Sequence, residues 1–296
     1  MTNKLRHRVA FSTLSFIAST SQHLAHEEGA PFSGAIIDPP ILHHAHIENE
    51  QRLNFFALRG VAIGNGAKRS GYAAELELAY GSKNFKYGFE VFLPVSNMPL
   101  PDGPGRAAGL GDIEVRPLKY ALVMKPDFVL STASAFGLPT GSKQDGLGSG
   151  NTSLMQLLFL DKALGNWAGG VNLGLGTNLG GERESEFEYG VGLAYSFIRG
   201  TKFGQAVPAR PNQKWVLSPS IELVGRRILQ GDTAGTDSVS LIPGLTFWHV
   251  PSGWQFRFGV QIPTTREREA DTALIFQVGN HLNWGRLLGR KKDAPH

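Results

Sequence analysis

The sequence contains no cysteine among its 296 residues. That absence excludes disulfides, thiolate metal sites, cysteine nucleophiles and a lipidated N-terminal cysteine. An exported chain of this size must therefore take its stability from backbone hydrogen bonds and from apolar surface. A closed β-barrel supplies the backbone hydrogen bonds without leaving exposed sheet edges.

Long apolar runs are missing as well. Beyond the N-terminus, no stretch approaches the roughly 18 apolar residues of a transmembrane helix, which excludes a helical membrane protein. Membrane β-barrels are not excluded, because their apolar residues alternate with polar ones and give only a weak hydropathy signal.

The N-terminus has the layout of a secretory signal peptide over residues 1–21. Three basic residues come first, an apolar run follows at 9–18, and small residues occupy 19–21. This order is typical of a cleaved leader, and the alternative is an amphipathic anchor helix. The leader holds three basic and no acidic residues, so its removal lowers the formal charge from +4 to +1. Nucleic-acid binding thereby loses its main support.

The stretch 165–200 shows the pattern that predicts the fold. In its first arm, 167–179, the odd-numbered residues, such as Leu173, are mostly apolar. The even-numbered residues, such as Asn172, are small or polar. This period of two marks a strand, and the second arm repeats it after the short polar segment GGERES. Each arm runs to about a dozen residues, longer than a usual globular strand and about what a tilted strand needs to cross a bilayer.

The same alternation recurs along the chain, with turn signals between the runs. Twelve strands are predicted, at 51–62, 71–81, 85–95, 111–122, 127–139, 152–162, 167–179, 186–199, 214–226, 237–249, 253–264 and 272–284. We therefore expect an all-β fold: a transmembrane antiparallel up-and-down β-barrel of about 12 strands over residues 51–284, followed by a basic tail at 285–296. The connection 200–213 is long where a short turn is expected, so either it is a periplasmic insertion or the strand count slips there.

Polar and charged residues on the inward face are predicted to line the lumen, because an Arg or Lys facing lipid at mid-bilayer costs around 2–4 kcal/mol. The candidate lumen residues are Glu75, Glu77, Lys86, Glu90, Arg116, Asn172, Asn178, Glu188, Glu222, Arg226 and Arg257. Pro117 interrupts its strand, and the apolar face changes parity there, which predicts a bulge. Small inward residues such as Gly190 and Gly192 are expected to leave one side of the lumen open.

The stretch 111–142, GDIEVRPLKYALVMKPDFVLSTASAFGLPTGS, is followed by the glycine-rich DGLGSG. It resembles the outer-membrane family of meta-pathway of phenol degradation transporters. The likeness is carried by a GD that opens a strand, a Lys-Tyr near its end, and a following strand that ends in LPTGS. The resemblance implies an outer-membrane channel for small, often aromatic or apolar compounds. One departure is that GRLLGRKKDAPH follows the last strand, so either Trp284 serves as the terminal aromatic signal or the tail is an addition.

Residues 22–50 are punctuated by Pro and Gly and show no sustained periodicity. We expect a periplasmic segment that folds back into the barrel mouth as a plug. Its histidines His43, His44 and His46, together with Glu48 and Glu50, are candidate ligands for zinc, copper or nickel. The alternative is that these histidines are solvated or serve in packing.

The predicted function is passive diffusion of a small solute through a barrel in the outer membrane of a Gram-negative bacterium. The expected partners are membrane lipid and lipopolysaccharide, the solute and the barrel assembly machinery, with no cofactor and no nucleic acid. Two alternatives are a structural or adhesive barrel and an outer-membrane hydrolase. A hydrolase needs a base beside its nucleophile, and the predicted outer loops hold Ser, Asp and Glu residues but no His. We therefore expect no enzyme and no catalytic residues.

Overall fold

The computed structural model describes residues 39–63, 67–100, 104–181, 183–197, 214–249, 252–268 and 270–281. The predicted signal peptide, the first part of the predicted plug (22–38), the connection 200–213 and the basic tail lie outside these ranges. Among the described residues, no helix is long and apolar enough to cross a membrane.

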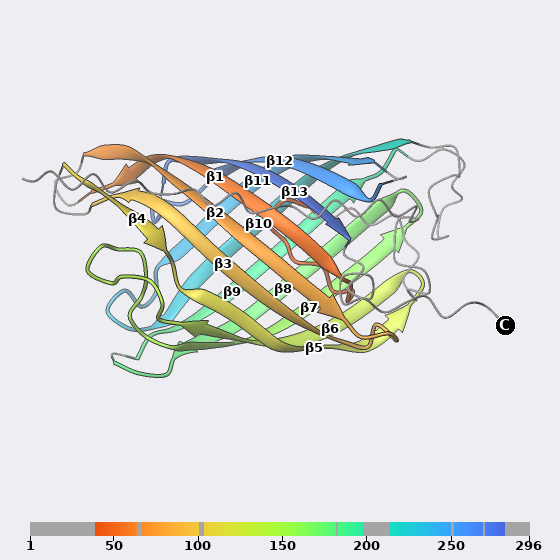
Figure 1. Cartoon of the computed structure of the whole chain (residues 1–296), viewed down its shortest axis with the longest axis horizontal. Helices are drawn as coiled ribbons and strands as arrows, with labels where there is room; N and C mark the ends of the chain where they lie inside the picture. Colours follow the sequence, from red (N-terminus) through yellow and green to blue (C-terminus); the bar gives the residue numbers. More distant parts are fainter. Residues whose placement is uncertain are drawn as a thin grey trace, which may run out of the picture.

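The described residues form one antiparallel sheet of thirteen strands: β1 (Glu50–Ala62), β2 (Lys68–Gly81), β3 (Tyr87–Pro99), β4 (Arg106–Leu110), β5 (Ile113–Lys125), β6 (Phe128–Leu138), β7 (Ser153–Leu164), β8 (Trp167–Asn178), β9 (Ser185–Tyr195), β10 (Trp215–Gln230), β11 (Asp237–His249), β12 (Trp254–Pro263) and β13 (Thr272–His281). Pairing of β1 with β13 and of β2 with β3 closes the sheet into a barrel. Short β4 pairs with the end of β3, so the wall itself has twelve strands, which run obliquely to the long axis (Figure 1). The predicted fold class is confirmed.

The predicted strand 85–95 is wrong at both of its ends. Phe85 adopts a φ of 53° and is buried in the turn before β3. At the other end β3 continues to Pro99, because β4 folds back and pairs with it. Pro94 therefore lies inside β3. The predicted bulge is confirmed, since the register of β5 against β6 shifts between Val115 and Leu118.

The two ends of the barrel differ in their connections. We call the end with the short connections 82–86, 126–127 and 165–166 the turn end, and the opposite end, which includes β4 and the connection 139–152, the loop end. Since β1 begins at the turn end, the N-terminal residues 39–49 approach the barrel from there.

Large apolar side chains cover the outside of the wall. Examples with more than a third of their surface exposed are Tyr72, Phe89, Leu118, Leu122, Leu173, Leu175, Val191, Leu193, Ile221, Leu223, Phe258, Ile262 and Leu274. At the turn end, Trp167 packs edge-on against Tyr195 with ring centroids 4.8 Å apart, and the Trp215 ring lies 4.6 Å from that of His249. Aromatic rings at this level and an apolar band above them are the surface that a bilayer and its interface favour.

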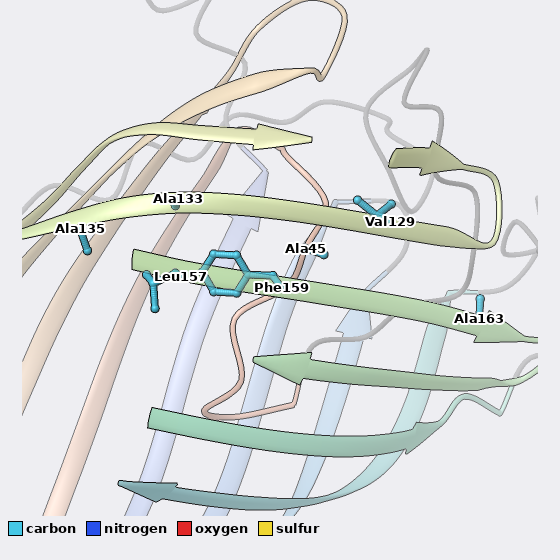
Figure 2. Close-up of a cluster of buried hydrophobic side chains, with 7 residues drawn as sticks. All are labelled: Ala45, Val129, Ala133, Ala135, Leu157, Phe159 and Ala163. Atoms are coloured by element: carbon cyan, nitrogen blue, oxygen red, sulfur yellow. The ribbon is translucent and has the colours of Figure 1, made fainter. Parts of the chain in front are cut away.

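The interior is packed rather than hollow along part of its length. Side chains of β6 and β7 form a buried apolar cluster with Ala45 of the N-terminal residues, as Figure 2 shows; its members are Ala45, Val129, Ala133, Ala135, Leu157, Phe159 and Ala163. The segment 39–49 therefore lies inside the barrel, and we refer to it as the lumen segment.

Candidate functional site

The lumen segment is held to the wall at a first anchor on β10. The carboxylate of Glu222, which is only 1% exposed, accepts hydrogen bonds from the backbone N–H groups of Ile41 at 3.0 Å and Leu42 at 2.7 Å. The side-chain amide of Gln277 on β13 donates to the carbonyl of Pro40. These bonds satisfy main-chain groups that would otherwise be costly to bury.

A second anchor lies on β7, three strands along the wall from β10. The carboxylate of Asp161 accepts hydrogen bonds from the backbone N–H of Ala45 at 2.6 Å and of His46 at 3.3 Å. Near the start of β1, the side-chain oxygen of Asn49 accepts a bond of 2.9 Å from the N–H of Gly81. Carboxylates on two wall strands that are separated by β8 and β9 thus hold the segment inside the barrel, and each bond to a charged acceptor contributes about 1.5–3 kcal/mol.

Glycines of the wall make room for the lumen segment. A Cβ added to Gly190 or Gly192 on β9 would lie 2.4 or 2.5 Å from a methyl group of Leu42. One added to Gly244 would lie 2.8 Å from the ring of Pro40. The expectation that these glycines leave the lumen open is therefore wrong at Gly192, where Leu42 occupies the space, whereas Gly190 contacts Leu42 and also lines the cavity described below.

A charged network covers the wall of β3 and β5. Glu90 lies at its centre, 3.0 Å from Arg116 Nη1 and 2.7 Å from Lys119 Nζ, and all three residues are at least 95% buried. Arg116 also contacts Glu114 at 2.7 Å and lies over the Phe92 ring, 4.3 Å from its centroid. The guanidinium donates to Nε2 of His43 at 3.2 Å, which ties this network to the lumen segment.

A second network surrounds the start of β1. Glu50 pairs with Arg52 at 2.7 Å and lies 3.6 Å from Arg257, while Arg52 reaches Glu77 at 3.4 Å. Since burial of one uncompensated charge is strongly unfavourable, these opposite charges need one another to stay inside the barrel.

Above the lumen segment lies a cavity of about 530 Å³. Leu42 and His43 line it on the side of the segment, and Glu267 and Arg268 line it at the loop end. Its walls combine apolar Met155 and Leu157 with charged residues, of which Arg226 lies 3.6 Å from Glu186. The cavity is therefore amphipathic and reaches from the loop end down to the lumen segment.

The candidate lumen residues fall into three groups. Glu77, Glu90, Glu222 and Arg257 are buried inside the barrel, and Glu75 accepts a bond of 3.1 Å from Asn54. Other candidates line the cavity: Arg116, Asn172, Glu188 and Arg226. Asn178 lies at the loop end of β8, where its backbone N–H donates to the carbonyl of Glu184 at 3.0 Å.

Lys86 is not a lumen residue. It precedes β3, is exposed at the turn end, and lies 5.6 Å from the centroid of the Tyr120 ring. The reason is that β3 begins at Tyr87, so the alternation on which the prediction relied does not extend to Lys86.

Three residues that hold the lumen segment or its networks were not predicted. Asp161 interrupts the apolar run LLFLDKAL and shares the inward parity of Phe159, which is a signal that the sequence does contain. Lys119 and Arg52 are also buried inside the barrel. Lys119 turns inward only because the bulge changes the parity of β5.

The predicted metal ligands separate in the structure. His44, His46 and Glu48 come together, with their ligand atoms within 4.8 Å of one another. His43 instead lies beside Arg116 and against the ring of Phe92, with ring centroids 5.4 Å apart. Glu50 takes part in the arginine network.

Hydroxyl groups at the loop end pair with carboxylates. Ser142 donates to Asp145 at 2.8 Å and Ser149 to Asp112 at 2.8 Å. The histidines within the described ranges are His43, His44, His46, His249 and His281, and none of them belongs to a connection at the loop end. These hydroxyl–carboxylate pairs therefore lack a histidine base among the described residues.

The fold and interior together define a closed twelve-stranded barrel with an apolar exterior, a charged interior and an internal segment. The structure is similar to the COG4313 outer membrane channel from Pseudomonas putida F1, with a TM-score of 0.52 and 16% identity, over 83% of this chain and 100% of that chain. It is also similar to the KdgM porin (TM-score 0.48, 10% identity, 79% and 99% covered) and the NanC porin (0.48, 9%, 79% and 99%). At such identities the likeness shows the fold alone. No protein-family model and no curated protein matches the chain, so the resemblance to phenol meta-pathway transporters stays a prediction.

Proposed function

We propose that the protein is an outer-membrane channel through which a small solute diffuses, with the lumen segment as its gate. The cavity that reaches from the loop end to the lumen segment is the observation that carries this proposal. In this orientation the turn end faces the periplasm, and the loop end faces outward, as the loops of bacterial barrels do.

The apolar exterior supports the membrane location. Outward residues such as Leu173 and Leu175 would expose apolar surface to water in a soluble protein, and their burial against lipid removes that cost. Membrane lipid and lipopolysaccharide are therefore the proposed surroundings, and the barrel assembly machinery is the proposed route of insertion.

The contacts of the lumen segment support a gating role, because hydrogen bonds and one fitted side chain hold the segment to the wall. Its main chain is fixed by Glu222 on one wall and Asp161 on another, and Leu42 fits beside wall glycines. A segment held by a few hydrogen bonds can leave the lumen at a cost of several kcal/mol, whereas a strand of the barrel cannot.

The cavity lining favours an amphipathic solute. Apolar side chains of Leu42, Met155 and Leu157 face the same space as charged groups of both signs, namely Arg116, Arg226 and Arg268 with Glu114, Glu186, Glu188 and Glu267. Such a lining suits an aromatic solute that carries a polar group: the ring contacts the apolar wall, while an acidic group would meet a guanidinium and a basic group a carboxylate. This proposal agrees with the aromatic solutes that the family resemblance implies.

Planar lipid bilayers test the function. We expect the mature chain, 22–296, to give small or intermittent single-channel currents, and a variant lacking 22–49 to give larger and steadier ones. Liposome swelling with sugars, amino acids and aromatic acids should then favour the aromatic acids. Heat-modifiable mobility on gels confirms that both proteins form barrels. If both proteins fold and neither conducts, the channel is wrong and a structural barrel is favoured.

A further inference from the structure

Three side chains of the lumen segment converge at one point inside the barrel. Nε2 of His44 lies 3.3 Å from one carboxylate oxygen of Glu48, and Nε2 of His46 lies 3.4 Å from the other. The two imidazole rings stack with centroids 4.1 Å apart and planes inclined by 24°. Both rings therefore direct the same nitrogen toward the same carboxylate.

The two nitrogen-to-carboxylate separations suit a transition-metal ion, and all three ligand atoms lie within 4.8 Å of one another. Ligand atoms bound about 2.0–2.1 Å from zinc in a tetrahedron lie roughly 3.3 Å from one another. All three residues are more than 90% buried, so few water molecules compete for their ligand atoms. Imidazole and carboxylate together suit zinc, copper and nickel, and zinc accepts two histidines with one glutamate and leaves a fourth position for water.

Asp161 provides an independent indication of a ligand. Its Oδ2 lies 3.1 Å from Nδ1 of His46 and also accepts the backbone N–H groups of Ala45 and His46. A carboxylate only accepts hydrogen bonds, so Nδ1 of His46 donates to Asp161, and Nε2, which faces the Glu48 carboxylate, is the nitrogen left to bind an ion in place of a proton. A carboxylate behind a histidine in this way orients metal-ligating imidazoles in proteins.

We propose that His44, His46 and Glu48 bind one zinc ion, and that Asp161 positions His46 for it. The ion would join residue 44 to residue 48 inside the barrel and so stiffen the lumen segment between its anchor on β7 and the start of β1. This site goes beyond the proposed channel function, since zinc can bind whether or not the barrel conducts.

Isothermal titration of zinc into the refolded full mature chain, prepared without a polyhistidine tag, tests the site. We expect one zinc per chain. Loss of a residue that orients a ligand without binding the metal weakens metal binding roughly 10- to 100-fold. We expect a loss of this size for Asp161→Asn. His46→Gln and Glu48→Gln remove ligands, so they should weaken zinc binding by at least as much. Cobalt bound to the same chain should give the intense visible absorption of a tetrahedral site.

The matched control is His43→Gln, which removes the neighbouring imidazole that faces Arg116 and should leave the zinc affinity unchanged. Gel mobility before and after heating shows that each variant forms a barrel. The proposal is overturned if the folded wild type binds no zinc, or if Glu48→Gln and His46→Gln bind it as tightly as the wild type, which would place the ion on other histidines of the chain. Bilayer conductance is not used as the readout, so a failed channel does not count against the site.

Discussion

The carboxylate of Glu222, on β10, accepts a hydrogen bond of 2.7 Å from the backbone N–H of Leu42. The two residues are 180 positions apart in the chain. This contact joins the barrel wall to the segment that lies inside the lumen.

Glu222→Gln should loosen the lumen segment while keeping the size of the side chain. A neutral amide forms weaker bonds to the two N–H groups, and loss of about 1.5–3 kcal/mol shifts the ratio of bound to released segment roughly 10- to 150-fold. We expect longer open times in single-channel recordings. Glu184→Gln, at an exposed site outside the strands, is the control; equal open times in the two variants would contradict the anchor.

Gly190→Ala should displace Leu42, because the added Cβ would lie 2.4 Å from its Cδ2 atom. Overpacking of this kind costs about 1–3 kcal/mol, and we expect a more open channel. Leu42→Ala in the same chain should restore the fit, and the double-mutant cycle should give a favourable coupling energy. Gly180→Ala, with no atom within 4 Å of its added Cβ, should have no effect. Additive effects of the two changes would show that Leu42 and Gly190 are not in contact.

Leu173→Arg and Asn172→Arg compare the two faces of one strand. Leu173 is exposed on the outside, while Asn172 lines the cavity and its buried Oδ1 has no hydrogen-bond partner. An arginine facing lipid near mid-bilayer costs about 2–4 kcal/mol, so Leu173→Arg should reduce the folded fraction in vesicles. Asn172→Arg should fold and change conductance. Equal folding yields would mean that the facing of β8 is wrong.

Glu90→Gln should destabilise the barrel more than a surface change does. It leaves Arg116 and Lys119 beside a neutral side chain, and removal of one partner of a buried pair costs about 3–5 kcal/mol. Urea unfolding in lipid vesicles measures the loss of unfolding free energy. A loss no larger than that of Glu184→Gln would show that the network is not important for stability.

The ion pairs of Asp271 at the loop end should persist in mild acid. Lys68 Nζ lies 2.7 Å from Asp271 and Arg268 Nη2 lies 2.9 Å from it, and the hydrogen bond from Lys68 holds the pKa of Asp271 below its ordinary value. Because the pKa is lower in the folded than in the unfolded chain, the pairing stabilises the fold above the unfolded pKa of about 3.9 and is lost as pH falls through the folded pKa. Carboxyl NMR shifts in micelles should show Asp271 ionised at pH 5, and Lys68→Met should raise its pKa. A pKa of Asp271 that Lys68→Met leaves unchanged would contradict this assignment.

The fold could be predicted because alternation is a local property of the chain. Leu173 and Asn172 differ by one position and therefore face opposite sides of the wall, whatever the rest of the barrel does. The bulge could be predicted at Pro117 for the same reason, since the proline and the change of parity both lie in one strand. Prediction failed at β4, a short strand that folds back onto the extended end of β3, and at Lys86, which lies in the turn before β3 and not in the strand.

By itself, the sequence determined a barrel with an apolar outside and a charged inside, because period two and strand length follow from residues that are near one another. Only the tertiary structure decided what fills that barrel. It placed Leu42 beside Gly190, and it joined His46 to Asp161 while it turned His43 toward Arg116. Contacts between an aperiodic segment and three separate strands depend on how the wall closes. The local sequence pattern does not predict these contacts, because they join residues that are far apart in the chain.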